Sequence, residues 1–207
     1  TTDGSDPRLD GGEINQAATG VNGGGTLLNF IDLEENGWNY LDTGTAQSDS
    51  GMIVGTAGFD NGDWKHRDFD DSGWSTGQAM LGYGGINNRT VNTTIDPPSN
   101  PRHPTSYFRK EFVVSDASTF TQLEISLIRD DGAILYLNGH EIGRSNIDRG
   151  NIAYSDLASG ATTNEGALLD LTTHILSPGQ LVEGTNVLAV ELHQSGTTSS
   201  DTGIDVI

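Results

Sequence analysis

Two adjacent aspartates, Asp130 and Asp131, stand directly before Gly132 at a predicted turn between strands. Neighbouring carboxylates repel each other unless a cation or hydrogen-bond donors lie between them. Two roles are therefore open for this pair. It can hold a metal ion or a ligand, or it can form its own turn, with aspartate accepting backbone N–H groups and glycine adopting a positive φ.

A second acidic group surrounds two tryptophans, Trp64 and Trp74. Asp60-Asn61-Gly62-Asp63 resembles part of a calcium-binding loop, and Asp70 and Asp71 add oxygen atoms nearby in the sequence. Calcium takes about six to eight oxygen ligands, so backbone carbonyls and another segment would have to contribute. The stretch lacks the ligand spacing of an EF-hand, and its alternative is two tight turns. The predicted ligands of a structural calcium ion are Asp60, Asp63, Asp70, Asp71 and Asp201.

Carbohydrate recognition combines aromatic faces, on which sugar rings stack, with polar side chains that bind hydroxyls. Tyr83, between two glycines, is the first choice for an exposed aromatic residue, whereas Trp64 and Trp74 are expected in the core. Arg144 and its near neighbour Asn146 either bind hydroxyls or simply end a strand. The predicted ligand-binding residues are Tyr83, Asp130, Asp131, Arg144, Asn146 and His193.

His193 leaves the end of a predicted apolar strand. It is either a hydrogen-bonded structural residue or part of a ligand site on the same edge as the Asp130 turn. No catalytic role is assigned to any residue, because nothing distinguishes a catalytic carboxylate pair from surface acids, and no His-Glu-x-x-His run or phosphate-binding loop occurs. We therefore expect a protein that is not an enzyme by itself.

The chain is strongly acidic, with 29 acidic residues against 10 basic ones and a net charge of −19. Such a surface repels phosphate backbones and anionic lipids, so we expect neither nucleic-acid binding nor membrane insertion. Two explanations of the excess carboxylates stay open. They keep a protein soluble, or some of them, clustered with asparagine and glycine, bind calcium.

The sequence contains no cysteine and no apolar run long enough to span a membrane. Disulfides, thiolate metal sites and cysteine nucleophiles are therefore excluded. The N-terminus lacks a basic region followed by an apolar core, so any signal peptide is expected to have been removed or to lie outside this sequence.

Turns and short strands dominate the predicted structure, as 28 glycines and the lack of long helical periodicity indicate. Residues 1–25 are predicted to be a linker and residues 26–207 the ordered domain. Asn138-Gly139, between two apolar runs, predicts the turn of a β-hairpin. Residues 86–105 are expected to form a long irregular loop. About eight to ten antiparallel strands indicate an all-β fold, specifically a jelly-roll β-sandwich.

Four segments resemble galactose-binding-like jelly rolls, which accompany secreted bacterial glycoside hydrolases, lyases and phosphoesterases. They occur in the family's order and lie within residues 38–207. The segments are Phe69-Asp70-Asp71-Ser72-Gly73-Trp74 with Leu81-Gly82-Tyr83-Gly84, Tyr107-Phe108-Arg109-Lys110-Glu111-Phe112, Asp130-Asp131-Gly132-Ala133 through Tyr136-Leu137-Asn138-Gly139, and Gly184-Thr185-Asn186-Val187 through Leu192-His193-Gln194.

The resemblance implies carbohydrate recognition through loops, one or more structural calcium ions, and a secreted, extracellular location. Our first hypothesis is a non-catalytic carbohydrate-binding module of a polysaccharide-degrading or adhesive bacterial protein. Its partners would be a polysaccharide or glycan and other domains of the same polypeptide. The alternative is a structural or adhesin-type sandwich that contacts proteins or neighbouring domains without binding sugar, and a small glycoside hydrolase or lyase ranks last.

Overall fold

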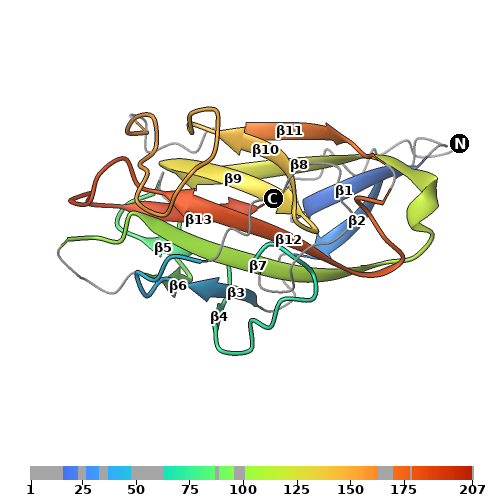
Figure 1. Ribbon diagram of the computed structural model, residues 1–207, viewed down its shortest axis with the longest axis horizontal. Helices are drawn as coiled ribbons and strands as arrows, with labels where there is room; N and C mark the ends of the chain where they lie inside the picture. Colours follow the sequence, from blue (N-terminus) through green and yellow to red (C-terminus); the bar gives the residue numbers. More distant parts are fainter. Residues whose placement is uncertain are drawn as a thin grey trace, which may run out of the picture.

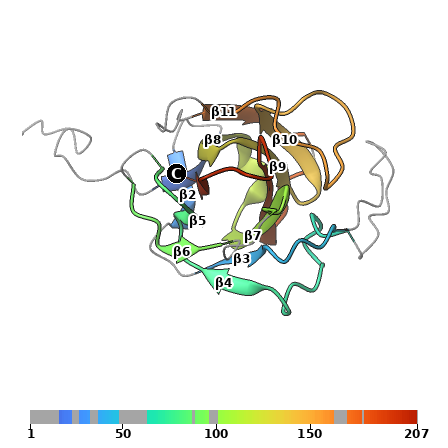
Figure 2. The same ribbon diagram turned by 90° about the vertical axis from the view of Figure 1, so that its left-hand side faces the viewer.

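Two β-sheets packed face to face make up the fold (Figures 1 and 2). The computed structural model describes residues 16–22, 27–32, 37–47, 63–86, 89–95, 101–162, 170–177 and 179–206. These residues form thirteen strands and one short 3-10 helix, η1 (Ala117–Thr119). The all-β sandwich expected from the sequence is therefore confirmed, with more strands than expected because several span only two to four residues.

The six-stranded sheet has the order β10-β9-β12-β7-β3-β4. Its central strand, β12, pairs with β7 on one side and with β9 on the other, antiparallel in both cases. The strands of this sheet are β3 (Trp38–Leu41), β4 (Ser75–Gly77), β7 (Thr105–Val114), β9 (Gly132–Leu137), β10 (His140–Ser145) and β12 (Gly184–His193).

The seven-stranded sheet has the order β2-β1-β8-β13-β5-β6, with β11 pairing additionally with β8. Only the short β5–β6 pair is parallel among the described pairs. In Figure 2, β5 and β6 lie on one side of the core, with β9 and β10 on the other. The strands are β1 (Gln16–Asn22), β2 (Leu27–Asp32), β5 (Leu81–Tyr83), β6 (Thr93–Thr94), β8 (Phe120–Asp130), β11 (Asp170–Ile175) and β13 (Thr202–Val206).

The main core fills the space between the two sheets. Alternate residues of each strand point into it, because successive side chains of a strand face opposite sides of the sheet. From β12 these are Leu188, Val190 and Leu192, which meet Leu123, Ile125 and other residues of the opposite sheet in one hydrophobic cluster. Burial of this apolar surface is the main driving force for the sandwich.

The hairpin between β9 and β10 turns at Asn138 and Gly139, whose φ angles are 49° and 89°. Both values are positive, as a two-residue type I′ turn requires, and the predicted hairpin is confirmed. The Asn138 side chain does more than permit the turn. Its Nδ2 donates to Asn186 Oδ1 at 2.7 Å, and its Oδ1 accepts the backbone N–H of Val187 at 2.8 Å. The turn is therefore bound to the central strand.

One segment differs from the sequence-based expectation. Gln16–Asn22 lies within the predicted linker, yet here it forms β1 and pairs with both β2 and β8. Its position depends on backbone hydrogen bonds, which any residue except proline can form, so a composition rich in small polar residues did not indicate it. The division of the chain into linker and domain stays a prediction.

Candidate functional site

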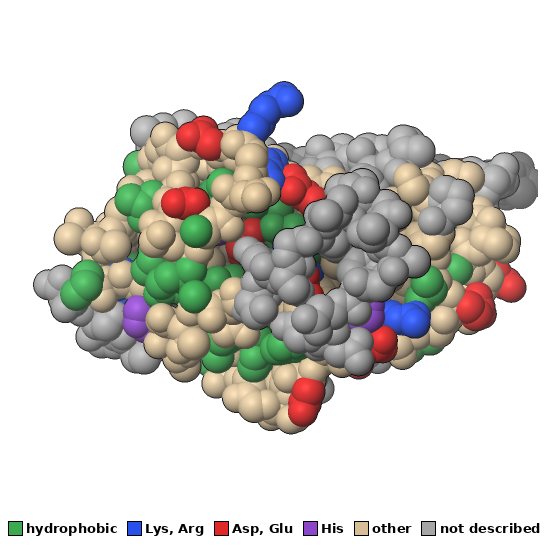
Figure 3. Space-filling model, viewed as in Figure 1, with side chains coloured by type: hydrophobic (Ala, Val, Ile, Leu, Met, Phe, Trp, Pro, Cys, Tyr) green, Lys and Arg blue, Asp and Glu red, His purple; other side chains and the backbone are tan. Residues whose placement is uncertain are grey.

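Two loops, residues 63–74 and residues 146–162, contribute side chains that pack against the outer face of the six-stranded sheet. Tyr107, Tyr136 and Val187 project from the strands beneath and meet these loop side chains in a second hydrophobic cluster. The central strand β12 is therefore buried on both faces from Asn186 to His193. Figure 3 looks onto this covered face, where hydrophobic side chains lie among acidic ones. The buried cluster consists of Trp64, Tyr107, Ile134, Tyr136, Ile147, Ala158, Val187 and Ala189.

The first loop is held by Arg109, a β7 residue that is only 1 % exposed. Its Nε donates to Asp71 Oδ2 at 2.6 Å, and its Nη1 donates to the backbone carbonyls of Trp64 and His66. A buried guanidinium needs both a counter-charge and acceptors for its donors. Asp71 supplies the counter-charge, so its carboxylate serves the loop.

The other predicted calcium ligands do not converge. Asp63 accepts the backbone N–H of Lys65 and lies 3.5 Å from its Nζ. Asp70 is exposed, and hydrogen bonds from the side chain of Ser72 and from its backbone N–H lower the pKa of Asp70. Asp60 lies outside the described residues. Among the described residues, no group of three or more His, Asp or Glu side chains is arranged to hold a metal ion. The candidates that the structure describes are therefore not brought together in one group, and the calcium site stays a prediction.

Asp131 holds the second loop. Its Oδ1 accepts the backbone N–H of Thr162 and its Oδ2 that of Ser195, both at 2.7 Å. Its carbonyl oxygen accepts Asn146 Nδ2 at 3.0 Å, so one residue holds both the start and the end of residues 146–162. Donors within the protein thus occupy both carboxylate oxygens. They come from distant segments, and Gly132 does not have a positive φ, so the arrangement differs from the self-contained turn expected as one alternative.

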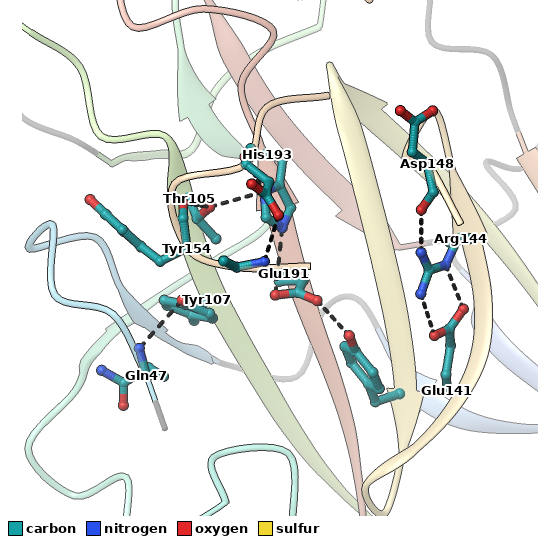
Figure 4. Close-up of polar contacts among 12 residues, drawn as sticks. Gln47, Thr105, Tyr107, Glu141, Arg144, Asp148, Tyr154, Glu191 and His193 are labelled. Atoms are coloured by element: carbon teal, nitrogen blue, oxygen red, sulfur yellow. Dashed lines mark hydrogen bonds and ion pairs between the residues drawn. The ribbon is translucent and has the colours of Figure 1, made fainter. Parts of the chain in front are cut away.

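His193 holds the middle of the same loop and is fully buried (Figure 4). Its Nδ1 lies 2.8 Å from the carbonyl oxygen of Asp156 and 3.0 Å from Thr105 Oγ1, which itself donates to the carbonyl of Tyr154. A carbonyl only accepts, so Nδ1 carries the proton. His193 is therefore a hydrogen-bonded residue of the interior, which agrees with the first of the two alternatives given in the sequence analysis.

Beneath His193, Glu191 takes part in a buried polar pair. Glu191 Oε2 lies 3.5 Å from His193 Nε2, and the Tyr136 hydroxyl donates to Glu191 Oε1. The indole Nε1 of Trp64, in the same cluster, is buried and has no hydrogen-bond partner among the residues that the structure describes. The sequence analysis predicted no role for Glu191, because an acidic residue inside a buried strand is uncommon and no motif marks it.

At the adjoining end of the sandwich, Asp130 and Tyr83 are both buried. Burial raises the pKa of Asp130 to about 7, with further contributions from the hydrogen bond and charge of Asp131 and from the charge of Asp201. Tyr83, expected to be exposed, is only 9 % exposed. The Arg102 guanidinium covers its ring at 4.0 Å, and Gln194 Nε2 donates to its hydroxyl. Tyr83 therefore offers no open face for stacking.

Asp201 has hydroxyl partners, since Ser199 Oγ and Ser200 Oγ donate to its Oδ1 at 3.3 and 3.2 Å. Four of the predicted ligand residues lie together at this end of the sandwich, through contacts with Asp131 or through the pairing of β12 with β9. The four are Asp130, Asp131, Asn146 and His193. Internal hydrogen bonds engage all of them, so their role here is to join loops.

Arg144 is the remaining predicted ligand residue, and it lines an open pocket of about 550 Å³. Its Nε and Nη2 donate to the two oxygens of Glu141, each at 2.7 Å, and its Nη1 donates to the carbonyl of Asp148 (Figure 4). The Glu141 carboxylate, through these bonds, raises the pKa of Arg144. The pocket is lined by Glu141, Arg144, Ile147, Arg149 and Gly150.

A β-bulge in β10 creates this pair. In a regular strand, residues 141 and 144 would face opposite sides of the sheet. The register shifts between Glu141 and Gly143, so Glu141 stands opposite Tyr136 and Arg144 opposite Ile134. Both of these partners belong to the outer cluster, so the bulge turns both charged side chains to the outer face. Strict alternation conceals this pairing, which explains why the sequence analysis missed Glu141.

Residues 73–77 match the Gly-x-Ser-x-Gly pattern of a hydrolase nucleophile elbow, which needs a sharp strand-to-helix turn. Ser75 instead begins β4 and pairs opposite Tyr40 of β3. The local geometry is therefore that of a strand and not of an elbow. No described helix has the length and apolar character to cross a membrane.

No protein-family model matches this sequence, and no curated protein matches it. Solved structures show a weak likeness. A β-glucuronidase of glycoside hydrolase family 2 aligns with a TM-score of 0.38 at 13 % identity, over 86 % of this chain and 14 % of that one. A Bacteroides uniformis β-glucuronidase 2 aligns with a TM-score of 0.41 at 14 % identity, over 83 % and 17 %.

A β-glycosidase from Bacteroides vulgatus aligns with a TM-score of 0.37 at 18 % identity, over 82 % of this chain and 19 % of that one. The chain therefore spans less than a fifth of the length of each of these enzymes. Alignments this weak establish neither a shared architecture nor a shared activity.

Proposed function

We propose that this chain is a non-catalytic carbohydrate-binding module, and that its binding site is the pocket lined by Glu141, Arg144 and Arg149. The observation that carries the proposal is the Glu141–Arg144 pair, which is held in a fixed orientation at an open pocket. The pocket volume falls within the range of about 300–1,000 Å³ typical of small-molecule sites.

The chemistry of the pocket suits a sugar. Each carboxylate oxygen of Glu141 accepts one N–H from Arg144 and keeps a second lone pair that can accept a sugar hydroxyl. The exposed Arg149 adds donors, and Ile147 adds an apolar surface for the C–H groups of a sugar ring. Because Glu141 and Arg144 are oriented before the ligand arrives, ordering these two side chains costs little entropy on binding.

This mechanism differs from the stacking expected from the sequence. Among the described residues, the only large hydrophobic side chains classed as exposed are Val113 and Leu157, neither of which is aromatic. The described residues that line the pocket include no aromatic side chain, so binding there would rest on hydroxyl recognition and be modest in affinity. Linkage to other binding domains of the same polypeptide would amplify it.

Affinity electrophoresis in gels containing neutral plant and marine polysaccharides tests the proposal. We expect at least one polysaccharide to retard the chain, and Arg149→Ala to weaken that retention severalfold. Arg67→Ala, which removes an exposed arginine from the other loop, is the matched control and is expected to leave retention unchanged. If no polysaccharide retards the wild-type chain, the proposed function is wrong.

Structural calcium and secretion remain parts of the proposal. The support for calcium is the acidic composition and the family resemblance, and no contact among the described residues adds to it. An ion bound only by the native state raises the melting temperature, so a chelator would lower it. A melting curve that EDTA leaves unchanged would contradict bound calcium. Detection of the protein outside the producing cell tests secretion.

The second candidate is a structural domain that packs against a neighbouring domain of the same polypeptide. A cleft of about 770 Å³ near η1, lined in part by Phe120, Leu176 and Leu181, favours it. Apolar surface of this kind is common where proteins contact each other. Absence of sugar binding, together with co-purification of this chain with an adjacent domain expressed separately, would support this candidate over the first.

A further inference from the structure

The pocket that we propose for carbohydrate contains two of the ten basic residues of a chain with net charge −19. Two arginines in one pocket would ordinarily favour an anion, such as the carboxylate of a uronic acid or a sulfate ester. Which class of sugar the pocket accepts therefore depends on how much of this positive charge is available to a ligand.

Glu141 occupies Arg144 in the geometry that an anionic ligand would use. The two N–H···O bonds, both 2.7 Å, are the paired donors with which a guanidinium binds a carboxylate or sulfate. The remaining Nη1 donates to the carbonyls of Asp148 and Gly150. An incoming anion would have to displace an internal carboxylate that is already in place.

The surroundings add further negative charge. Asp148 lies next to the pocket, with its Oδ1 accepting Ser159 Oγ at 2.8 Å. The field of buried Glu191 also reaches Arg144. Glu141 and Asp148 stand opposite Arg144 and the exposed Arg149, so these four groups at the pocket carry no net positive charge. Negative charge near the pocket repels an anionic ligand and so lowers the affinity of the pocket for it.

We infer that Glu141 is a specificity-determining residue, which neutralises Arg144 so that the pocket accepts uncharged saccharides and rejects uronic acid and sulfated ones. The inference rests on the proposed function and adds the class of ligand to it. A sugar hydroxyl can donate a hydrogen bond to a spare lone pair of Glu141, whereas the Glu141 carboxylate repels a carboxylate or sulfate group of the ligand.

The test compares paired polysaccharides that differ in charge, using agarose with carrageenan and methyl-esterified with de-esterified galacturonan. Inorganic sulfate, titrated by NMR, is a probe that needs no knowledge of the sugar. We expect the wild-type chain to bind each acidic polymer more weakly than its neutral counterpart and to show no sulfate binding. Glu141→Gln frees Arg144 while keeping an acceptor oxygen, and it is expected to raise affinity for sulfate and for the acidic polymers about tenfold or more.

Two variants control for charge and folding. Glu111→Gln removes one negative charge from an exposed position of β7 and is expected to produce no gain. Combining Glu141→Gln with Arg144→Gln removes the freed cation, so the gain should disappear. Because the readout is a gain of binding, a variant that merely misfolds cannot imitate it, and circular dichroism checks the fold of each.

Three results would overturn the inference. One is wild-type binding to acidic polymers as tight as to their neutral counterparts. Another is Glu141→Gln, correctly folded, with no new sulfate binding, and the third is an equal gain in Glu111→Gln. The first of these leaves the proposed function intact. Failure of the wild-type chain to bind any saccharide refutes the proposed function and this inference together.

Discussion

Arg109 and Asp71 lie side by side under the loop of residues 63–74, with 2.6 Å between Nε and Oδ2. The carboxylate was a candidate for calcium, and in the structure it is the counter-charge of an arginine that is 1 % exposed. One ion pair thus fixes the first covering loop to β7, much as Asp131 fixes the second. The loops that surround the outer cluster are held by buried charges.

Asp71→Asn should therefore destabilise the fold, because it leaves the buried guanidinium of Arg109 without its counter-charge. Breaking a buried pair in this way typically costs about 3 kcal/mol of unfolding free energy. Urea denaturation measures the loss. The matched control is Asp70→Asn at the exposed neighbouring position, where a change within about 0.5 kcal/mol is expected. Equal losses in both variants, reversed by calcium, would instead favour a metal role for the two aspartates.

Asp130 makes stability depend on pH. Burial raises its pKa from 3.8 to about 7, so the folded state holds a proton that the unfolded chain releases above about pH 4. The free energy of unfolding should thus fall between about pH 4 and pH 7 through this group and level off above. Asp130→Asn cannot ionise, so it should gain stability relative to wild type as the pH rises. Urea unfolding at pH 4, 6 and 8 measures this, with exposed Asp116→Asn as control.

Asp131→Ala should release the end of the second loop at Thr162 and the neighbouring Ser195, whereas the backbone carbonyl that accepts Asn146 Nδ2 is kept. The amides of Thr162 and Ser195 lose an ionised acceptor, and bonds of this kind contribute about 1.5–3 kcal/mol each. Amide hydrogen exchange should therefore speed up at both residues, while the central amides of β12 serve as internal reference. Unchanged protection at Thr162 and Ser195 would show that other contacts hold the loop.

Asn138 permits a comparison of two substitutions. Asn138→Gly keeps the positive φ but loses the side-chain bonds to Asn186 and Val187, at a cost of about 2 kcal/mol. Asn138→Ala loses these bonds and also strains the turn, which adds about 1 kcal/mol. Chemical denaturation of both variants separates the two effects. Equal stability of the two would contradict the strain component.

Structural features that follow from turn preferences or from the pattern of apolar residues could be predicted from the sequence. The hairpin at Asn138 follows from turn chemistry, and the buried strand ending at His193 follows from its apolar residues. The expected core position of Trp64 agrees with its burial in the outer cluster, whereas Trp74 is only partly buried against that cluster. These features need only residues that are close in sequence.

Features that depend on distant partners could not be predicted. Nothing near Arg109 in the sequence indicates that its partner is Asp71, and the two are 38 positions apart. The bulge that turns Glu141 and Arg144 to one face breaks the alternation on which strand prediction relies. Tyr83 looked exposed because glycines flank it, but Arg102 from another segment covers its ring.

The order of the two sheets has a consequence for synthesis of the chain on the ribosome. Both β12 and β13, which lie near the C-terminal end, occupy interior positions of their sheets. Until β12 emerges, the β9–β10 hairpin has no connection to β7, and until β13 emerges, β5 and β6 have none to β8. Each sheet of the nascent chain thus remains in two unjoined parts until its late strand, β12 in one sheet and β13 in the other, has emerged.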